Sequence, residues 1–172
     1  FWIPEENIQG RVERDRVPYD QWVDQGYIKA TPGNVVDYAF IRAEINKLSE
    51  QYQIMEIGFD PWNATALATW LTEDGASLVP ISQGFAHMTA PTKFVEKLIL
   101  GRQLDHSGNP VLRWMANNVT LSQDPAGNYR PDKGKSTDRI DGIVALIIAC
   151  ACVIRHMGQE NSVYDERGIL VI

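Results

Sequence analysis

A strand–helix–strand segment in the first half of the chain constrains the fold most. Residues 54–59 form a compact apolar run typical of a buried strand, residues 64–71 have helical spacing, and residues 77–81 form a second strand. The connection is long enough for a right-handed crossover between parallel strands. Strands that alternate with helices predict an α/β sheet covered by helices, in which ligands bind at the carboxyl ends of the strands.

The other segments add helices and a hairpin to this unit. The pattern predicts two short helices within 5–25, a strand at 27–30, a helix at about 38–52 behind an Asp37 N-cap, a helix from about 89 to 100 with Pro91 in its first turn, a short helix at 110–114, a hairpin of 119–123 with 129–131, and a long apolar helix capped by Ser136 or Thr137 that ends near 155. With 172 residues, 44% of them hydrophobic, a single domain over residues 1–172 is expected. Residues 1–4 resemble the end of a strand, so we expect the chain to be part of a longer protein.

The charge distribution argues against a protein that simply coats nucleic acid. The net charge is −6, but residues 93–139 carry a net charge of +3 and the rest of the chain carries −9. A surface that faces phosphates is therefore expected to come from this stretch. The same charges also suit ordinary solvated faces, and that alternative stays open.

Several function classes are not expected. The longest apolar run, residues 143–154, is too short to cross a bilayer, and no secretory leader pattern is visible. Cys150 and Cys152 stand two apart on a predicted helix, where they point to different sides and suit buried reduced thiols of a cytosolic protein. Histidines and cysteines lack zinc spacing, and no phosphate-binding glycine loop is present, so ATP hydrolysis by this chain is not expected.

Two aspartates stand where an α/β fold places its chemistry. Asp60 ends the strand at 54–59, and Asp141 lies near the start of the long apolar helix, beside Ile140 and Ile143. Each has an ordinary alternative, because Asp-Pro commonly opens a turn and an acid in the first turn complements the helix dipole. Two carboxylates that meet at a sheet edge are also what Mg²⁺ prefers, with waters or phosphates in its other positions.

Several stretches resemble one protein family, in the order in which that family has them. They are residues 16–22, 31–38, 58–64 (Gly-Phe-Asp-Pro-Trp-Asn-Ala), 106–118 (from His106 to the Asn117-Asn118 pair), 133–145 and 162–168. Together they resemble the C-terminal nuclease domain of phage DNA-packaging large terminases, and the 106–118 stretch is the most specific. The resemblance covers nearly the whole chain and implies a ribonuclease-H-like mixed sheet flanked by helices, without its first strand.

The resemblance also implies a metal-dependent endonuclease that cuts concatemeric double-stranded viral DNA by two-metal hydrolysis with Mg²⁺ or Mn²⁺. By position, Asp60 and Asp141 would be the metal ligands and catalytic residues, and the hairpin at 119–131 would lie near the DNA. The residues that would shape the site or meet DNA are His106, Asn109, Arg113, Asn118, Lys133 and Lys135. The implied partners are double-stranded DNA, the portal protein, the small terminase subunit and the ATPase domain of the same longer chain. The implied location is the host cytoplasm, with no membrane.

One departure from the family pattern concerns its first acid. That acid lies on a strand upstream of the segment that Phe1 matches, so this sequence holds no counterpart to it. We therefore expect at most one weakly bound ion and little or no cleavage. The open functions are a DNA endonuclease, a non-catalytic module that docks on the packaging motor or grips DNA, and another ribonuclease-H-like enzyme such as an integrase or resolvase. The 106–118 stretch argues against the last.

Overall fold

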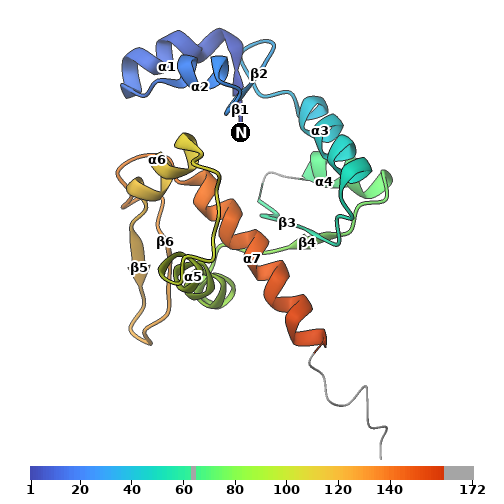
Figure 1. Ribbon diagram of the computed structural model, residues 1–172, viewed down its shortest axis with the longest axis vertical. Coiled ribbons are helices and arrows are strands. Elements are labelled where there is room, and N and C mark those ends of the chain that lie inside the picture. Colours follow the sequence, from blue (N-terminus) through green and yellow to red (C-terminus); the bar gives the residue numbers. More distant parts are fainter. Residues whose placement is uncertain (63–64, 161–172) are drawn as a thin grey trace, which may run out of the picture.

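The computed structural model describes residues 1–62 and 65–160, with side chains described to residue 157. Its elements lie along one central helix, α7, which crosses the molecule diagonally in Figure 1. In chain order the elements are β1 (Trp2–Pro4), a 3-10 turn (Glu5–Asn7), α1 (Ile8–Asp15), α2 (Tyr19–Asp24), β2 (Lys29–Thr31), α3 (Tyr38–Gln51), β3 (Ile57–Phe59), α4 (Thr65–Glu73), β4 (Leu78–Pro80), α5 (Phe85–Leu100), α6 (Pro110–Asn118), β5 (Leu121–Gln123), β6 (Tyr129–Pro131) and α7 (Asp141–Glu160).

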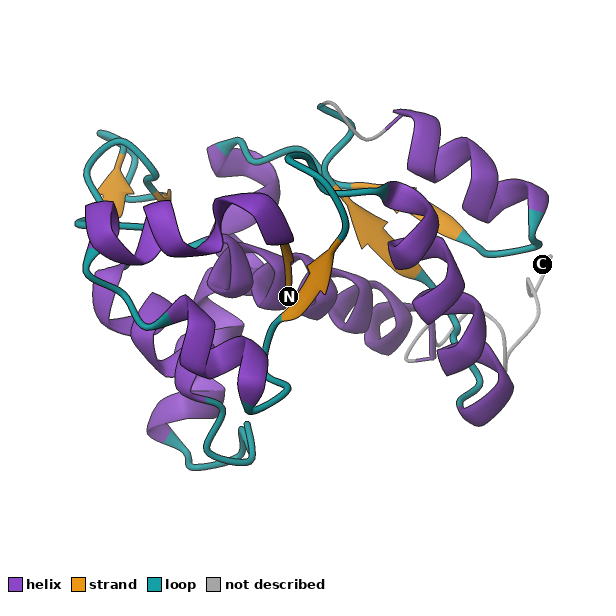
Figure 2. Cartoon of the chain, turned by 90° about the horizontal axis from the view of Figure 1, so that it is seen from above, coloured by secondary structure: helices purple, strands orange, loops and turns teal. Residues whose placement is uncertain are grey.

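The strands pair in twos within the described residues. Strand β1 pairs with β2 and β3 with β4, both in parallel, whereas β5 and β6 form an antiparallel hairpin. The predicted crossover is confirmed, because α4 connects the parallel strands β3 and β4. The expectation of one continuous mixed sheet is wrong for this part of the chain, since each three-residue strand has a single partner. Figure 2 shows the pairs as separate patches among the helices.

Helix α7 is the core of the molecule. Its apolar positions Ile143, Val144, Ile147 and Ile148 are buried, as the sequence predicts for this run. Helices α5 and α6 and strand β3 all pack on it. The buried thiols of Cys150 and Cys152 are free, and burial raises the pKa of both. In the part of the chain that the structure describes, no helix is both long enough and apolar enough to cross a bilayer.

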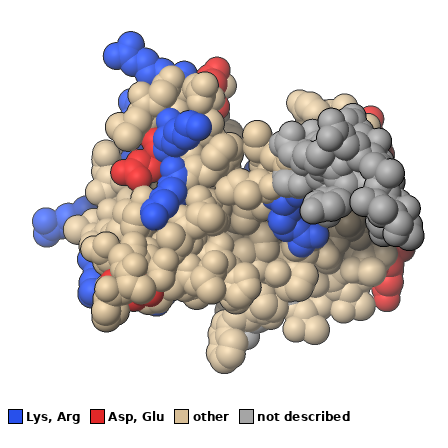
Figure 3. Space-filling view, turned by 90° about the horizontal axis from the view of Figure 1, so that it is seen from below, with Lys and Arg blue, Asp and Glu red and all other residues tan. Residues whose placement is uncertain are grey.

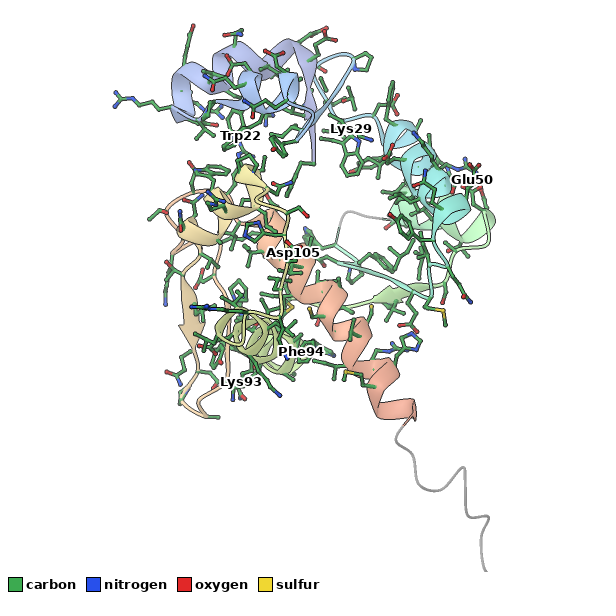
Figure 4. The ribbon with its side chains drawn as sticks, viewed as in Figure 1. Trp22, Lys29, Glu50, Lys93, Phe94 and Asp105 are labelled. Atoms are coloured by element: carbon green, nitrogen blue, oxygen red, sulfur yellow. The ribbon has the colours of Figure 1, made fainter. Side chains whose placement is uncertain are left out.

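An aromatic cluster fastens the N-terminal helices to this core. The rings of Tyr19 and Trp22 in α2 lie 6.1 and 5.6 Å from the ring of Trp114 in α6, measured between centroids. In Figure 4, Trp22 lies below α2, on the side that faces α6. Ring pairs at these distances contribute about 0.5–1.5 kcal/mol each beyond the area they bury. The cluster therefore places α1 and α2 over the start of α7.

Two predicted helix starts are wrong. Helix α5 begins at Phe85 behind Gly84, so Pro91 lies inside the helix rather than in its first turn. Helix α7 begins at Asp141, not behind Ser136 or Thr137. Those two residues hold the preceding loop instead. The Ser136 hydroxyl donates to the carbonyl of Asp132 and accepts from the backbone of Thr120, and the backbone of Thr137 donates to Asn118. Helix α6 also runs on to Asn118, beyond its predicted end at 114.

Candidate functional site

Strand β3 brings Asp60 to the edge of a parallel strand pair. Asp60 follows β3 directly and is half-buried. Its Oδ1 accepts a hydrogen bond from the backbone N–H of Trp62 at 3.1 Å, which is the turn geometry expected for Asp before Pro61. Its Oδ2 accepts a hydrogen bond from Nε2 of Gln83, in the loop after β4. Each oxygen keeps a further lone pair, so the turn role and a ligand role are compatible.

Helix α7 presents Asp141 to solvent at its first position. The neighbours of this acid face inward: Ile140 is 1% exposed, and the N–H of Gly142 points at the sulfur of Met115 at 3.0 Å. The Asp141 side chain is 60% exposed and pairs with Lys133, whose Nζ lies 2.9 Å from its Oδ1. The carboxylate therefore sits at the positive end of the helix dipole and already holds one cationic group.

Strand β3 runs antiparallel to α7, and this direction indicates toward which end of α7 the chain carries Asp60. Glu56 lies beside Arg155 and His156, with 3.4 Å between the nitrogen and oxygen atoms of each pair, whereas Gly58 packs against Ile148 and Cys152. Two more strand residues cover about 7 Å, the rise of four to five helical residues. Continued in the same direction, the chain after β3 leads Asp60 toward the first turns of α7.

Surface hollows lie beside β3 and beside the first turns of α7. Ala145 lines a hollow that it shares with Gly58 and also a cavity of about 400 Å³ that it shares with Asp141. A second, more polar hollow of about 320 Å³ lies between Asp141, Lys133 and Asp15. Among residues 1–62 and 65–160, however, no three His, Cys, Asp or Glu side chains are grouped closely enough to hold a metal ion. The described residues thus offer two candidate acids, Asp60 and Asp141, and no complete metal-binding cluster.

The 106–118 stretch forms a tight turn and helix α6. Ser107 and Gly108 have positive φ angles, and the carbonyl of His106 accepts a hydrogen bond from the N–H of Asn109. Asn109 caps α6, since its Oδ1 accepts from the N–H of Leu112 at 3.0 Å. The side chains of His106 and Arg113 are exposed. The turn therefore gives Asn109 a structural role, and the site roles of His106 and Arg113 stay predictions.

Asn118 links α6 to the loop before α7. It is 9% exposed, and its Nδ2 donates to the carbonyl of Arg139 at 3.1 Å. The hydroxyl of Thr137 lies 3.4 Å from its Oδ1. This buried side chain supports the backbone two residues before Asp141, which suits the predicted site-shaping role better than a contact with DNA.

The loop at 132–140 carries the two predicted lysines. Asp132 accepts hydrogen bonds from Ser122 and from the backbone of Gly134 and Lys135, and these bonds, the one from Ser122 first, lower its pKa. Lys135 lies 4.0 Å from Asp132. Lys133 reaches Asp141 instead, so the structure brings only one of the two lysines to a candidate acid.

The basic side chains of residues 93–139 contact several different partners. Lys93 of α5 lies over the ring of Tyr129 at 5.3 Å, and Arg130 lies over Phe85 at 5.0 Å. Figure 4 shows Lys93 and Phe94 leaving α5 on different sides. Tyr129 also donates to Glu96, which raises the pKa of its phenol. On the face in Figure 3, Lys and Arg gather on the left half, the side of α5 and the hairpin. This distribution is compatible with a phosphate-facing surface and with solvated faces.

Two residues beside Asp60 were not singled out from the sequence. Gln83 holds its carboxylate, and the side chain of Trp62 is 80% exposed. Gln83 could have been found from the crossover, because the residues that follow two neighbouring parallel strands meet at the same edge. The family-like stretch at 162–168 lies outside the described residues, as do Asn63 and Ala64.

Comparisons with known proteins agree with one another. The family model described as terminase large subunit, endonuclease domain, matches residues 2–157. The chain is 33% identical over 168 residues to the protein named terminase, large subunit, of Enterobacteria phage HK97, which covers 96% of this chain and 33% of that protein. It is 30% identical over 167 residues to Protein YmfN of Escherichia coli (strain K12), covering 94% of this chain and 37% of that protein. The chain thus spans about a third of the length of these relatives.

Solved structures show the same likeness. The crystal structure of the HK97 bacteriophage large terminase matches with a TM-score of 0.81 at 35% identity, over 88% of this chain and 32% of that one. The large terminase nuclease from thermophilic phage G20c matches with a TM-score of 0.54 at 18% identity, over 68% of this chain and 63% of that one. The second match supports the fold alone.

Proposed function

The chain belongs to the family of terminase large subunit endonuclease domains, and from this premise we propose that it cuts concatemeric double-stranded viral DNA during genome packaging. The family implies DNA cutting in packaging. The finer proposal is phosphodiester hydrolysis at a site built on Asp60 and Asp141, in a fold of the ribonuclease-H-like class. The proposal is supported by the antiparallel course of β3 along α7, in which Glu56 lies beside Arg155 and Gly58 packs against Ile148, so that the chain after β3 heads toward the start of the helix, where Asp141 stands.

The two carboxylates suit Mg²⁺ or Mn²⁺. Asp60 is oriented by two neutral donors, and Asp141 is exposed and already accepts a cationic ammonium group. Mg²⁺ is usually held by one or two carboxylates, with waters and substrate phosphates in its other positions. When bound, such ions lower the pKa of water and stabilise the charge of the leaving oxygen. Asp60 and Asp141 would hold the ions, and Lys133 would move from Asp141 toward a phosphate.

The absence of a three-ligand group in the described residues shapes what we expect of the 172-residue chain. With two acids in reach, it binds at most one ion, weakly, and cleaves DNA slowly or not at all. The same observation favours one second candidate, a non-catalytic module that grips DNA or docks on the packaging motor. We further propose that the portal protein, the small terminase subunit and an ATPase domain in the same longer protein are partners, in the host cytoplasm. An integrase or resolvase is not supported by the family match.

The test is the conversion of supercoiled plasmid to nicked and linear forms in Mn²⁺ or Mg²⁺. Asp60→Asn and Asp141→Asn are compared with Asp24→Asn, a matched change of an exposed acid at the end of α2. Slow cleavage that both site variants abolish and the Asp24 variant keeps supports the endonuclease. Cleavage that survives both site variants would contradict this site. Plasmid binding without cleavage, both by this chain and by a longer chain that includes the preceding strand, would favour the gripping module.

A further inference from the structure

Gln83 lies beside Asp60 because of the register between two parallel strands. Phe59 of β3 pairs with Pro80 of β4, and the N–H of Ile81 extends the pairing by donating to the carbonyl of Phe59 at 2.8 Å. Asp60 follows β3 directly, and Gln83 is the third residue after β4, behind Ile81 and Ser82. Nε2 of Gln83 donates to Oδ2 of Asp60, and both side chains are half-buried.

The loop that carries Gln83 is fastened at both ends. On one side Ile81 is 5% exposed and belongs to the core. On the other side Gly84 is the N-cap of α5, and the hydroxyl of Ser82 lies 2.8 Å from Nδ1 of His87. Gln83 is therefore presented from a fixed backbone, which is what a side chain needs in order to hold a neighbour in one geometry.

The Asp60 carboxylate is held at both of its oxygens. The N–H of Trp62 donates to Oδ1, and the amide of Gln83 donates to Oδ2. Because a carboxylate rotates freely without such donors, the two bonds fix its plane and direct its remaining lone pairs. Both donors are neutral, so the full negative charge stays available to a cation. Asp141 differs, since its partner Lys133 carries a competing positive charge.

We propose that Gln83 is a positioning residue that orients Asp60 for binding a divalent cation. This inference rests on the proposed function, because it requires Asp60 to be a ligand. Gln83 itself acts through its hydrogen bond and touches neither metal nor DNA. Partners that orient metal ligands in this way typically change metal affinity about 10- to 100-fold when they are removed.

The test is a Mn²⁺ titration of the 172-residue chain followed by NMR line broadening, without DNA. Gln83→Met keeps the length of the side chain and removes only its hydrogen bonding, and Gln83→Ala removes the side chain. Gln51→Met, at the exposed end of α3, is the matched control. We expect the apparent Mn²⁺ dissociation constant to rise about 10- to 100-fold in both Gln83 variants, and to stay unchanged in the control. The melting temperature of Gln83→Met should remain near that of the unmodified chain.

An Asp60→Asn titration separates this inference from the proposed function. If Asp60→Asn abolishes Mn²⁺ broadening while Gln83→Met binds as tightly as the unmodified chain, the positioning role is overturned and the ligand role of Asp60 stands. If Asp60→Asn binds Mn²⁺ normally, or the unmodified chain shows no broadening, both the proposed site and the role of Gln83 are overturned. Equal losses in Gln83→Met and Gln51→Met would also overturn it.

Discussion

The close contact between β3 and α7 makes Gly58→Ala the most informative single change. A Cβ atom at this position would lie 2.7 Å from Cγ2 of Ile148, 2.9 Å from the sulfur of Cys152 and 3.2 Å from the carbonyl oxygen of Ile148. Ordinary contact begins near 3.4 Å, so β3 must move away by about 0.7 Å. The helix cannot yield easily, because a β-branched side chain is stiff at χ1 and the carbonyl belongs to the helix backbone.

The cost can be estimated from these contacts. Overfilling a packed core costs about 1–3 kcal/mol, and replacing Gly by Ala returns about 0.4–1 kcal/mol by restricting the unfolded chain. The free energy of unfolding should therefore fall by about 0–2.6 kcal/mol, which lowers the melting temperature of a chain of this size by up to about 10 °C. Asp60 lies two residues further along the chain, directly after β3, and displacements near 1 Å can reduce catalysis about 100-fold. Any cleavage by the chain should thus fall with its stability.

Thermal unfolding followed by circular dichroism measures the first effect, and plasmid nicking measures the second. Gly10→Ala is the matched control, because Gly10 lies in the exposed helix α1 and an added Cβ meets nothing within 4 Å. The control variant should have a free energy of unfolding about 0.4–1 kcal/mol higher than that of the unmodified chain. If Gly58→Ala were as stable as Gly10→Ala, the contact between β3 and α7, and with it the placement of Asp60, would be refuted.

Three further changes test other parts of the structure. The pKa of Asp74 is lowered to about 2, chiefly by the hydrogen bond from Arg42, so the stabilising ionised form is lost only as the pH falls from about 4 through 2. Asp74→Asn should therefore weaken the dependence of the melting temperature on pH across that range. An unchanged pH profile would contradict the pairing of Arg42 with Asp74. Lys133→Met removes the ammonium that competes with a cation at Asp141 and should tighten Mn²⁺ binding several-fold in the NMR titration, whereas weaker binding would point to another role. Asn118→Ala removes the part-buried hydrogen bond to the carbonyl of Arg139 and should cost about 0.5–1.5 kcal/mol in urea unfolding, and a cost near zero would contradict that bond.

The elements that the sequence predicted well depend on short-range chemistry. Asp37 caps α3 as expected, with its carboxylate accepting from the N–H of Ala39 at 2.8 Å. The Asp124–Asn128 turn closes the predicted hairpin, where Asp124 accepts from Ala126 and Asn128. In both cases donor and acceptor lie within four residues, so the pattern of residue types is sufficient to predict the bond.

The wrong helix starts depend on contacts over longer distances. Ser136 and Thr137 have good N-cap chemistry, but their hydroxyls serve Asp132, Thr120 and Asn118, 4 to 19 residues away. Tertiary contacts thus outcompeted a local preference of about 1 kcal/mol. Pro91 shows the converse, because α5 continues through it although proline removes one helical hydrogen bond. The buried neighbours Met88, Thr92 and Val95 offer the compensating packing.

The candidate site likewise combines features that depend on local patterns with features that depend on long-range contacts. Asp60 follows the end of a strand that the local pattern predicts, whereas Asp141 stands at a helix start that the local pattern places several residues too early. Their partners depend on register. A slip of one residue between β3 and β4 would turn Gln83 to the opposite face, because side chains alternate along a strand. Val79 and Ile81 are buried in the same core cluster as residues of α5 and α7, and their burial favours the observed register. The orientation of the acid is therefore fixed by core packing, and core substitutions that shift β4 should change metal binding without touching the site.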